Sequence, residues 1–395
     1  MSLEHGSITL RRFFIKGTCK PSSSPIWVEQ LKENAFVGKE LGLDEENLGW
    51  AVFGEELATD FSLANTVYGK FILFSLRRDS IKVPSSLVNL HLKSRIKERM
   101  RNDELEQIGK KQRGEIKEEI IEELMAKMPT QIQVIQVMLD TARNEVFIAS
   151  TSDKVLELFE GLFTKSFDLN LSKADFLSTA HQMLEEKTFS NVMDDPGISI
   201  GDPFEVHPEF EDSLEGRLGA SFLTWILFLL QTGGNYKSKR QGEMGIVLNE
   251  YLLLEGEALG SKQMLLKKGA LSRCAELAIS LNIGKLVSKI RLETVRDGIS
   301  KDSEENADME KWNFVVDKLH FDLASLKVPK PSEGTEVARM LARFNNIIDA
   351  FELMEDLFEN FLELRYGKNG AKLQDEMREW VNDLKAGRFD QIAAG

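Results

Sequence analysis

The sequence is poor in the residues that build extracellular scaffolds. Its 395 residues include only two cysteines, Cys19 and Cys274, which are far apart in the chain. So few cysteines argue against a disulfide framework and are typical of a protein from a reducing compartment. We therefore expect a cytoplasmic protein.

Long apolar runs are also missing. The longest, from Ala220 to Leu230, is too short to cross a bilayer. The stretch from Leu10 to Lys16 is interrupted by charged residues, so it does not have the pattern of a signal peptide. These features predict a protein that makes no contact with a membrane.

Patterns that indicate catalysis or cofactor binding are equally scarce. No glycine-rich segment ends in the Lys-Ser/Thr pair of a phosphate-binding loop. The five histidines lack the spacing of metal ligands: His5, His91, His181, His207 and His320. We expect a binding protein without catalytic residues, metal or cofactor. Acidic residues leave a metal-dependent nuclease open as an alternative, with these candidate ligands: Asp194, Asp195, Glu209 and Glu211.

Positive charge is scarce overall but concentrated in one segment. The chain has a net charge of −14, whereas residues 93–117 contain nine Lys or Arg against five Asp or Glu. Locally concentrated positive charge is the simplest means of holding a polyanion. A solvated helix with internal ion pairs, such as Arg99 with Asp103, is the competing interpretation.

The pattern of apolar residues predicts an α+β fold with a helical insertion. Expected strands cover residues 8–15, 50–53, 70–75, 132–139, 145–150, 167–171, 245–254, 262–266, 285–296 and 312–324. Expected helices cover residues 25–33, 87–102, 104–127, 153–163, 173–187, 214–232, 270–281, 334–366 and 371–385. We expect loops at residues 188–211 and 233–242, both rich in glycine or polar residues. The two helices between 87 and 127 would form a hairpin that is packed only at its root.

The order of several motifs resembles the bacterial recombination-associated RdgC family. The strongest block comprises Gly49-Trp50, IKVPSS at 81–86, EEIIEELMAKMP at 118–129 and the VFIASTSDKV segment at 146–155. A weaker block comprises FLTWILFLL at 222–230, QMLLKKGALS at 263–272, NIGKLVSKIRLE at 282–293, FVVDKLHFDLASLKVP at 314–329 and the helix at 345–363. The chain differs from shorter members by extra sequence at 188–260 and by an extension after Tyr366.

This resemblance implies a subunit of three parts that dimerises into a ring around duplex DNA. The parts would be a central α+β domain (1–80 with 128–190), a helical tip (81–127) and a base domain (191–395). Members of the family bind DNA with little sequence preference and restrain the RecA recombinase. The expected partners are therefore double-stranded DNA, a second copy of the chain and, through DNA, RecA. The expected location is the nucleoid.

Candidate DNA-binding residues fall into four groups. They are Lys262, Lys267 and Lys268 before an expected helix; Lys237, Lys239 and Arg240 in the loop at 233–242; Lys110, Lys111 and Arg113 in the tip; and Gln131 after it. Phosphate contact is the functional interpretation, because each Lys or Arg that neutralises a phosphate releases counterions. The helix after Lys268 would add backbone N–H donors. Solvent-exposed lysines without a ligand, or a scaffold that no longer binds DNA, remain the alternatives.

Overall fold

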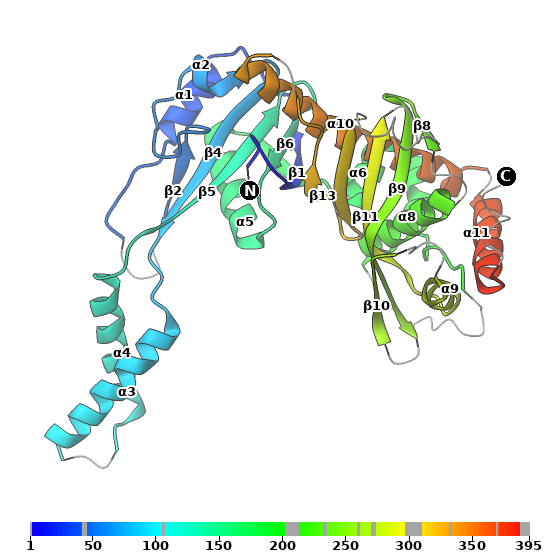
Figure 1. Cartoon of the computed structure of the whole chain (residues 1–395). Coiled ribbons are helices and arrows are strands. Elements are labelled where there is room, and N and C mark those ends of the chain that lie inside the picture. Colours follow the sequence, from blue (N-terminus) through cyan, green and yellow to red (C-terminus); the bar gives the residue numbers. More distant parts are fainter. Residues whose placement is uncertain are drawn as a thin grey trace. The chain divides into compact units, whose positions relative to one another are not determined.

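We describe the protein from a computed structural model, which confirms a mixed α+β fold with a large antiparallel sheet (Figure 1). The structure describes residues 2–41, 46–104, 107–201, 213–231, 235–258, 261–269, 274–296, 310–331, 334–368 and 370–387. Internal contacts divide the chain into two compact units. Unit 1 comprises Met1–Thr18, Arg143–Leu156 and Asn170–Gly395, and unit 2 comprises Cys19–Ala142 and Glu157–Leu169. The division into central domain, tip and base stays a prediction.

Unit 2 contains a small antiparallel sheet with strand order β5-β4-β2. Its strands are β2 (Glu46–Ala51), β3 (Val67–Tyr68), β4 (Phe71–Ser80) and β5 (Gln131–Asp140), and β3 pairs with β4. Its helices include α1 (Ile26–Glu33), α2 (Leu63–Thr66) and the part of α5 (Asp153–Phe167) from Glu157 onward. Trp50 is fully buried at the centre of this unit, where its indole N–H donates to Ser166 Oγ at 2.8 Å.

A helical hairpin connects β4 to β5 within unit 2, as the sequence predicts. It consists of α3 (Ser85–Asn102) and α4 (Lys110–Met125). Val88 and Leu92 of α3 pack against three buried residues of α4, Ile116, Ile120 and Leu124. All members of this cluster come from the hairpin or from Val83 just before it, so the hairpin has a small core of its own.

Unit 1 contains the large sheet, with strand order β10-β9-β11-β12-β13-β1-β6. In this unit β7 pairs with β1, and β8 pairs with β9. The strands are β1 (Ile8–Lys16), β6 (Glu145–Ile148), β7 (Asn170–Lys173), β8 (Asn235–Ser238), β9 (Gly242–Ala258), β10 (Ser261–Lys267), β11 (Leu286–Arg296), β12 (Lys311–Asp317) and β13 (His320–Lys327).

Aromatic residues of two helices form much of the core of unit 1. The helices of this unit include α6 (Phe176–Met183), α7 (Glu186–Met193), α8 (Leu214–Gln231), α9 (Ala275–Asn282), α10 (Glu336–Tyr366) and α11 (Gly370–Lys385). Phe222 of α8 contacts Phe358 and Phe361 of α10 at ring-centroid distances of 5.0 and 5.7 Å. The apolar stripe of α10 is therefore core, and it provides no argument for a dimer interface.

Several expected elements have different boundaries in the structure. The strand expected over 312–324 is a hairpin of β12 and β13, because Asp317 accepts the Leu319 N–H at 2.9 Å and turns the chain. The expected loops contain α7 and β8, and the helix expected over 173–187 is divided between α6 and α7. The helix expected from residue 270 begins at Ala275. No helix among the described residues is long and apolar enough to span a membrane.

Candidate nucleic-acid interface

The basic residues of α3 lie on two faces of the helix. Arg95 forms two hydrogen bonds of 2.8 Å with Glu123 of α4, and Arg99 pairs with Asp103 at 3.6 Å. Arg95 and Arg99 are one turn apart, so they share the face that is turned toward α4 and its acidic residues. The positive charge of these two arginines is thus compensated within the hairpin.

The remaining basic residues of α3 form a separate stripe. Lys93, Lys97 and Arg101 are spaced by four residues, so they lie on one face of the helix. All three are exposed, and none forms an ion pair with any residue that the structure describes. Arg101 donates only to the Lys97 carbonyl oxygen, at 3.5 Å. This stripe presents three charges to solvent.

The first turn of α4 adds a second group of unpaired cations. Lys110, Lys111 and Arg113 are exposed, with no ion pair to the described part of the chain. The partial positive charge of a helix N-terminus repels cations and attracts anions. Local helix stability therefore does not explain why these residues occupy this turn, and a bound polyanion would.

Charge is also graded along α4. The exposed glutamates Glu115, Glu118 and Glu122 follow the basic first turn on the later part of the helix. We use the name hairpin cation cluster for six hairpin cations that have no ion pair among the described residues: Lys93, Lys97, Arg101, Lys110, Lys111 and Arg113. Sequence reasoning selected the three from α4 as DNA-binding residues but not the three from α3, although their spacing by four was visible.

Gln131 lies at the other end of the hairpin. It is the first residue of β5, is exposed, and pairs with Ser80 across the β4–β5 ladder. The basic start of α4, at Lys110, is fifteen residues before its end at Met125, about 22 Å along the helix axis. Gln131 therefore lies near the root of the hairpin, away from the start of α4.

The helix start expected directly after Lys267 and Lys268 lies at residues 270–273, outside the described residues. Lys267 is the last residue of β10, and Lys268 follows with a positive φ of 63°. The next helix that the structure describes, α9, begins at Ala275, seven residues after Lys268. Lys262 lies near the start of β10, and all three lysines are exposed. Their role in DNA binding stays a prediction.

The basic segment at 237–240 is engaged by the acidic face of α10. Lys239 pairs with Glu359 and Glu363 at 3.2 and 3.1 Å. Arg240 pairs with Glu355 and Asp356, at 2.8 and 3.4 Å. The charges of Lys239 and Arg240 are thus largely compensated within unit 1. Lys237 is exposed and lies opposite Glu243 in the β8–β9 register.

The two lysine groups of unit 1 are far apart along β9. Lys237 pairs with Glu243 and Lys267 pairs with Tyr251. These two β9 residues are eight positions apart, which corresponds to about 26 Å along an extended strand. The structure therefore does not bring the two groups together into one contact site.

Among the described residues, no group of three or more His, Cys, Asp or Glu side chains could hold a metal ion. The described acidic residues that were candidates for a nuclease therefore form no metal site. Asp195 accepts two hydrogen bonds of 3.0 Å from Arg365. Burial raises the pKa of Asp195, but the hydrogen bonds from Arg365 and the Gly197 N–H lower it more, so the net shift is downward. Asp194 ends α7 as its C-cap, and Glu209 and Glu211 lie outside the described residues.

An α+β protein whose helical hairpin displays unpaired cations has the features of a polyanion-binding protein. Comparison with known families is consistent with this class. Residues 15–188 match the family model described as "Putative exonuclease, RdgC". This match shows that residues 15–188 are similar to the RdgC family, and it confirms the resemblance drawn from the motifs. The weaker motifs from residue 222 onward lie outside the match. No curated protein gives a significant match to the chain.

Proposed function

We propose that the protein is a DNA-binding protein of the RdgC type that holds duplex DNA through phosphate contacts. It acts as a homodimer that encircles DNA in the nucleoid, and it modulates homologous recombination by restricting the access of RecA to DNA. The similarity of residues 15–188 to the recombination-associated family supports this proposal. The dimer, the ring and the effect on RecA come from the family resemblance alone.

The observation on which the DNA-binding proposal depends is the hairpin cation cluster. Other cations of this acidic chain are neutralised by nearby carboxylates, as Arg95, Arg99, Lys239 and Arg240 are. The six residues of the cluster have no such partner among the described residues, although α4 provides several glutamates. Free Lys and Arg side chains on a helical surface can contact phosphates without reading base edges.

The structure changes the relative weight of the candidate contact residues. Lys110, Lys111 and Arg113 remain strong candidates, and Lys93, Lys97 and Arg101 join them. Lys239 and Arg240 are weaker candidates, because phosphate would have to compete with carboxylates already bonded to them. Lys262, Lys267 and Lys268 form a second exposed surface, in unit 1, that can be tested separately.

Substitution of the α3 stripe tests this proposal. We expect Lys93→Gln with Lys97→Gln and Arg101→Gln to weaken binding to unrelated duplexes by similar factors. The slope of log affinity against log salt should become shallower by up to about 2.7, since each phosphate contact contributes about 0.9. Fluorescence anisotropy between low and moderate salt measures both quantities.

Two further variants serve as comparisons. Arg95→Gln with Glu123→Gln removes a compensated ion pair from the same hairpin, so it should leave the salt slope unchanged. Lys267→Ala with Lys268→Ala tests the surface of unit 1. If both lysines contact phosphates, the slope of log affinity against log salt should become shallower by one to two units at most. We call the variant with Lys93→Gln, Lys97→Gln and Arg101→Gln the α3 triple variant. If it binds DNA as well as the parent does, while the Lys267 and Lys268 variant loses affinity, the DNA-binding site lies in unit 1 and not on the hairpin.

The nuclease alternative has a direct test. The family description names an exonuclease, and the sequence left metal-dependent cleavage open. Asp195 is a poor metal ligand here, because Arg365 already neutralises it. Incubation of linear duplex DNA with the protein and Mg²⁺ should leave the DNA intact, and progressive shortening would replace the binding proposal with an enzymatic one. A flat salt dependence without detectable binding would instead favour a scaffold that has no DNA partner.

A further inference from the structure

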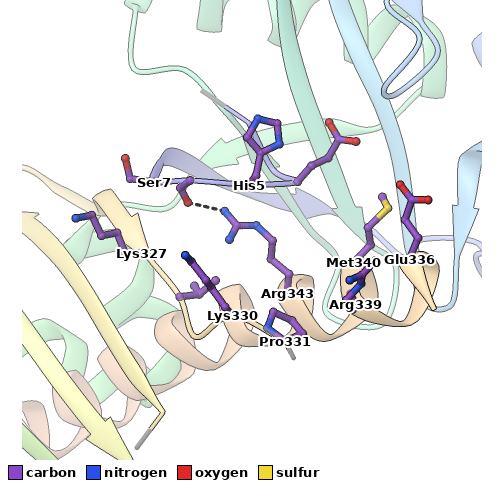
Figure 2. A pocket seen from close by; sticks show the side chains of 12 residues that line it. His5, Ser7, Lys327, Lys330, Pro331, Glu336, Arg339, Met340 and Arg343 are labelled. Carbon is purple, nitrogen blue, oxygen red and sulfur yellow. Dashed lines mark hydrogen bonds between the residues drawn. The ribbon is translucent and has the colours of Figure 1, made fainter. Parts of the chain in front are cut away.

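Unit 1 contains a cavity of about 660 Å³, a volume typical of small-molecule sites. Figure 2 shows it between the segment before β1, the end of β13 with the residues that follow, and the first turns of α10. Its charged lining is mainly cationic, with Lys327, Lys330, Arg339 and Arg343 against two carboxylates, Glu4 and Glu336. Val328, Pro331 and Met340 add apolar surface.

Arg343 is a buried cation without an acidic partner. Its Nε donates to the Leu3 carbonyl at 2.6 Å, and a terminal nitrogen donates to the Gly6 carbonyl at 2.8 Å. Both acceptors are uncharged, and no carboxylate of the described chain forms an ion pair with Arg343. Burial lowers the pKa of Arg343. The two bonds use only part of the donor capacity of a guanidinium, which has five N–H groups.

The other buried arginines show that this arrangement is exceptional in the described structure. Arg343 is 6% exposed, and three further arginines are similarly buried. Arg11 pairs with Asp322, Arg12 with Glu355 and Arg78 with Glu46. A buried charge without a counter-charge is strongly unfavourable. An anion in the cavity would give Arg343 the negative partner that carboxylates of the chain give to the other three buried arginines.

Further cations of the cavity are available to the same anion. In Figure 2 the side chains of Lys330 and Arg343 both extend into the middle of the cavity. Lys327, Lys330 and Arg339 are exposed and form no ion pair with described residues. The N-terminal turn of α10 also lines the cavity, and its partial positive charge adds to theirs. Several cations around one volume suit phosphate oxygens better than a single carboxylate.

We propose that this cavity binds a small phosphorylated molecule of nucleotide size. Arg343 and Lys330 hold the phosphate, and Lys327 and Arg339 compensate its remaining charge. The apolar surface of Val328, Pro331 and Met340 contacts the part of the ligand that carries no phosphate. The cavity shares no residue with the hairpin cation cluster of unit 2 or with the Lys262, Lys267 and Lys268 surface of unit 1.

Calorimetric titration of the full-length protein tests the site. ATP and pyrophosphate are the probes, and adenosine is the control without phosphate. We expect ATP to bind, pyrophosphate to bind more weakly because it lacks the apolar contacts, and adenosine not to bind. Absence of binding by both phosphorylated probes would overturn the proposal.

Substitutions identify the cavity as the place of binding. Lys327→Gln with Lys330→Gln changes two exposed side chains, so the fold should be retained, and ATP affinity should fall at least about tenfold for the loss of charge-assisted bonds. Lys368→Gln removes an exposed cation elsewhere in unit 1 that has no ion pair with the described residues, and it should have no effect. Arg343→Met should abolish binding, with circular dichroism to confirm folding. Equal ATP affinity in the Lys327 and Lys330 variant and the parent would disprove the assignment.

A DNA end is the other source of a phosphate, and it can be distinguished. A short single strand with a 5′-phosphate is compared with its unphosphorylated twin, using the α3 triple variant to remove the hairpin contacts. A preference for the phosphorylated strand without any ATP binding would overturn the small-molecule assignment. The Lys327 and Lys330 variant should retain duplex affinity, and the α3 triple variant should retain ATP affinity, so each proposal fails or stands separately.

Discussion

At the scale of single residues, the Gly49-Trp50 motif has a physical explanation that the sequence alone does not provide. Trp50 exchanges backbone hydrogen bonds with the segment at 34–36, donating to the Asn34 carbonyl at 3.0 Å and accepting from the Phe36 N–H at 2.8 Å. Gly49 thus lies directly against the backbone of Phe36, where a Cβ atom would overlap it. The motif thus marks the place where the backbone of β2 lies directly against the backbone of residues 34–36. The pattern of residues in the sequence does not show this contact.

Gly49→Ala should therefore destabilise unit 2. We expect a loss of about 1–3 kcal/mol, as for other insertions of a methyl group into packed structure. Hydrogen exchange of β2 and β4 measures the effect. Gly114→Ala is the matched control, because its Cβ would meet nothing within 4 Å. In α4 this change should stabilise the hairpin by about 1 kcal/mol through helix propensity. Equal stability of the Gly49→Ala variant and the parent would contradict the proposed overlap.

The buried carboxylate of Glu355 gives a second prediction at this scale. Burial alone would raise the pKa of Glu355, but Arg12 and Arg143 outweigh burial and lower it to about 2. Glu355→Gln removes one carboxylate from Arg12, Arg143 and Arg240, while Glu145 still pairs with Arg12 and Arg143, so it should cost at most about 3–5 kcal/mol at neutral pH. Glu359→Gln, on the same helix but in a more exposed pair with Lys239, should cost about 1 kcal/mol or less.

The pH dependence of stability follows from the sign of this shift. The folded pKa of Glu355 lies below the ordinary value of 4.5, so the unfolded chain takes up the proton first as pH falls. The stabilisation is complete above about pH 4.5 and is lost progressively toward pH 2. Urea denaturation of the parent should show this loss between pH 5 and pH 3, and the Glu355→Gln variant should show a smaller one. Parallel pH profiles would contradict the assignment.

At the scale of elements, the hairpin was predicted well and its charge pattern was not. Pro84 and the serines after it mark the start of α3, and the apolar residues at 116, 120 and 124 mark the packed face of α4. The pairing of Arg95 with Glu123 depends on the register between the two helices, which the sequence does not specify. For that reason the sequence could not separate compensated from uncompensated cations.

The self-contained core of the hairpin leads to an element-scale prediction. Ile120 is 1% exposed within a cluster formed by hairpin residues. Ile120→Ala should destabilise the hairpin by about 2–5 kcal/mol and raise hydrogen exchange over residues 85–125, while exchange in β4 and β5 stays low. The neighbouring Ile121 is only partly buried, so Ile121→Ala should have a smaller effect. Uniform loss of protection throughout unit 2 would show that the hairpin does not open separately.

At the scale of the whole molecule, the sequence predicts the fold class and most strands, but not which distant strands pair with one another. In the structure, β1, β6 and β7 belong to the same unit as β9–β13, because β1 pairs with β13, β6 and β7. Pairing between residues more than 300 positions apart has no local signature. The cavity of unit 1 escaped prediction for the same reason, since its lining comes from both ends of the chain.

The proposed ring gives the last prediction, at the same scale. A homodimer should have twice the 44.7 kDa mass of the chain by light scattering at micromolar concentration. A closed ring around DNA leaves a linear duplex by sliding off its ends but cannot leave a circle without opening. After loading at low salt, a wash with high salt weakens the phosphate contacts. The protein should then remain on nicked circular plasmid and be lost from the same plasmid after linearisation.

The α3 triple variant should load less well but show the same preference for circles, because topology does not depend on those cations. Equal loss from both DNA forms, or a monomeric mass, would rule out encirclement and leave a DNA-binding protein held by its phosphate contacts alone.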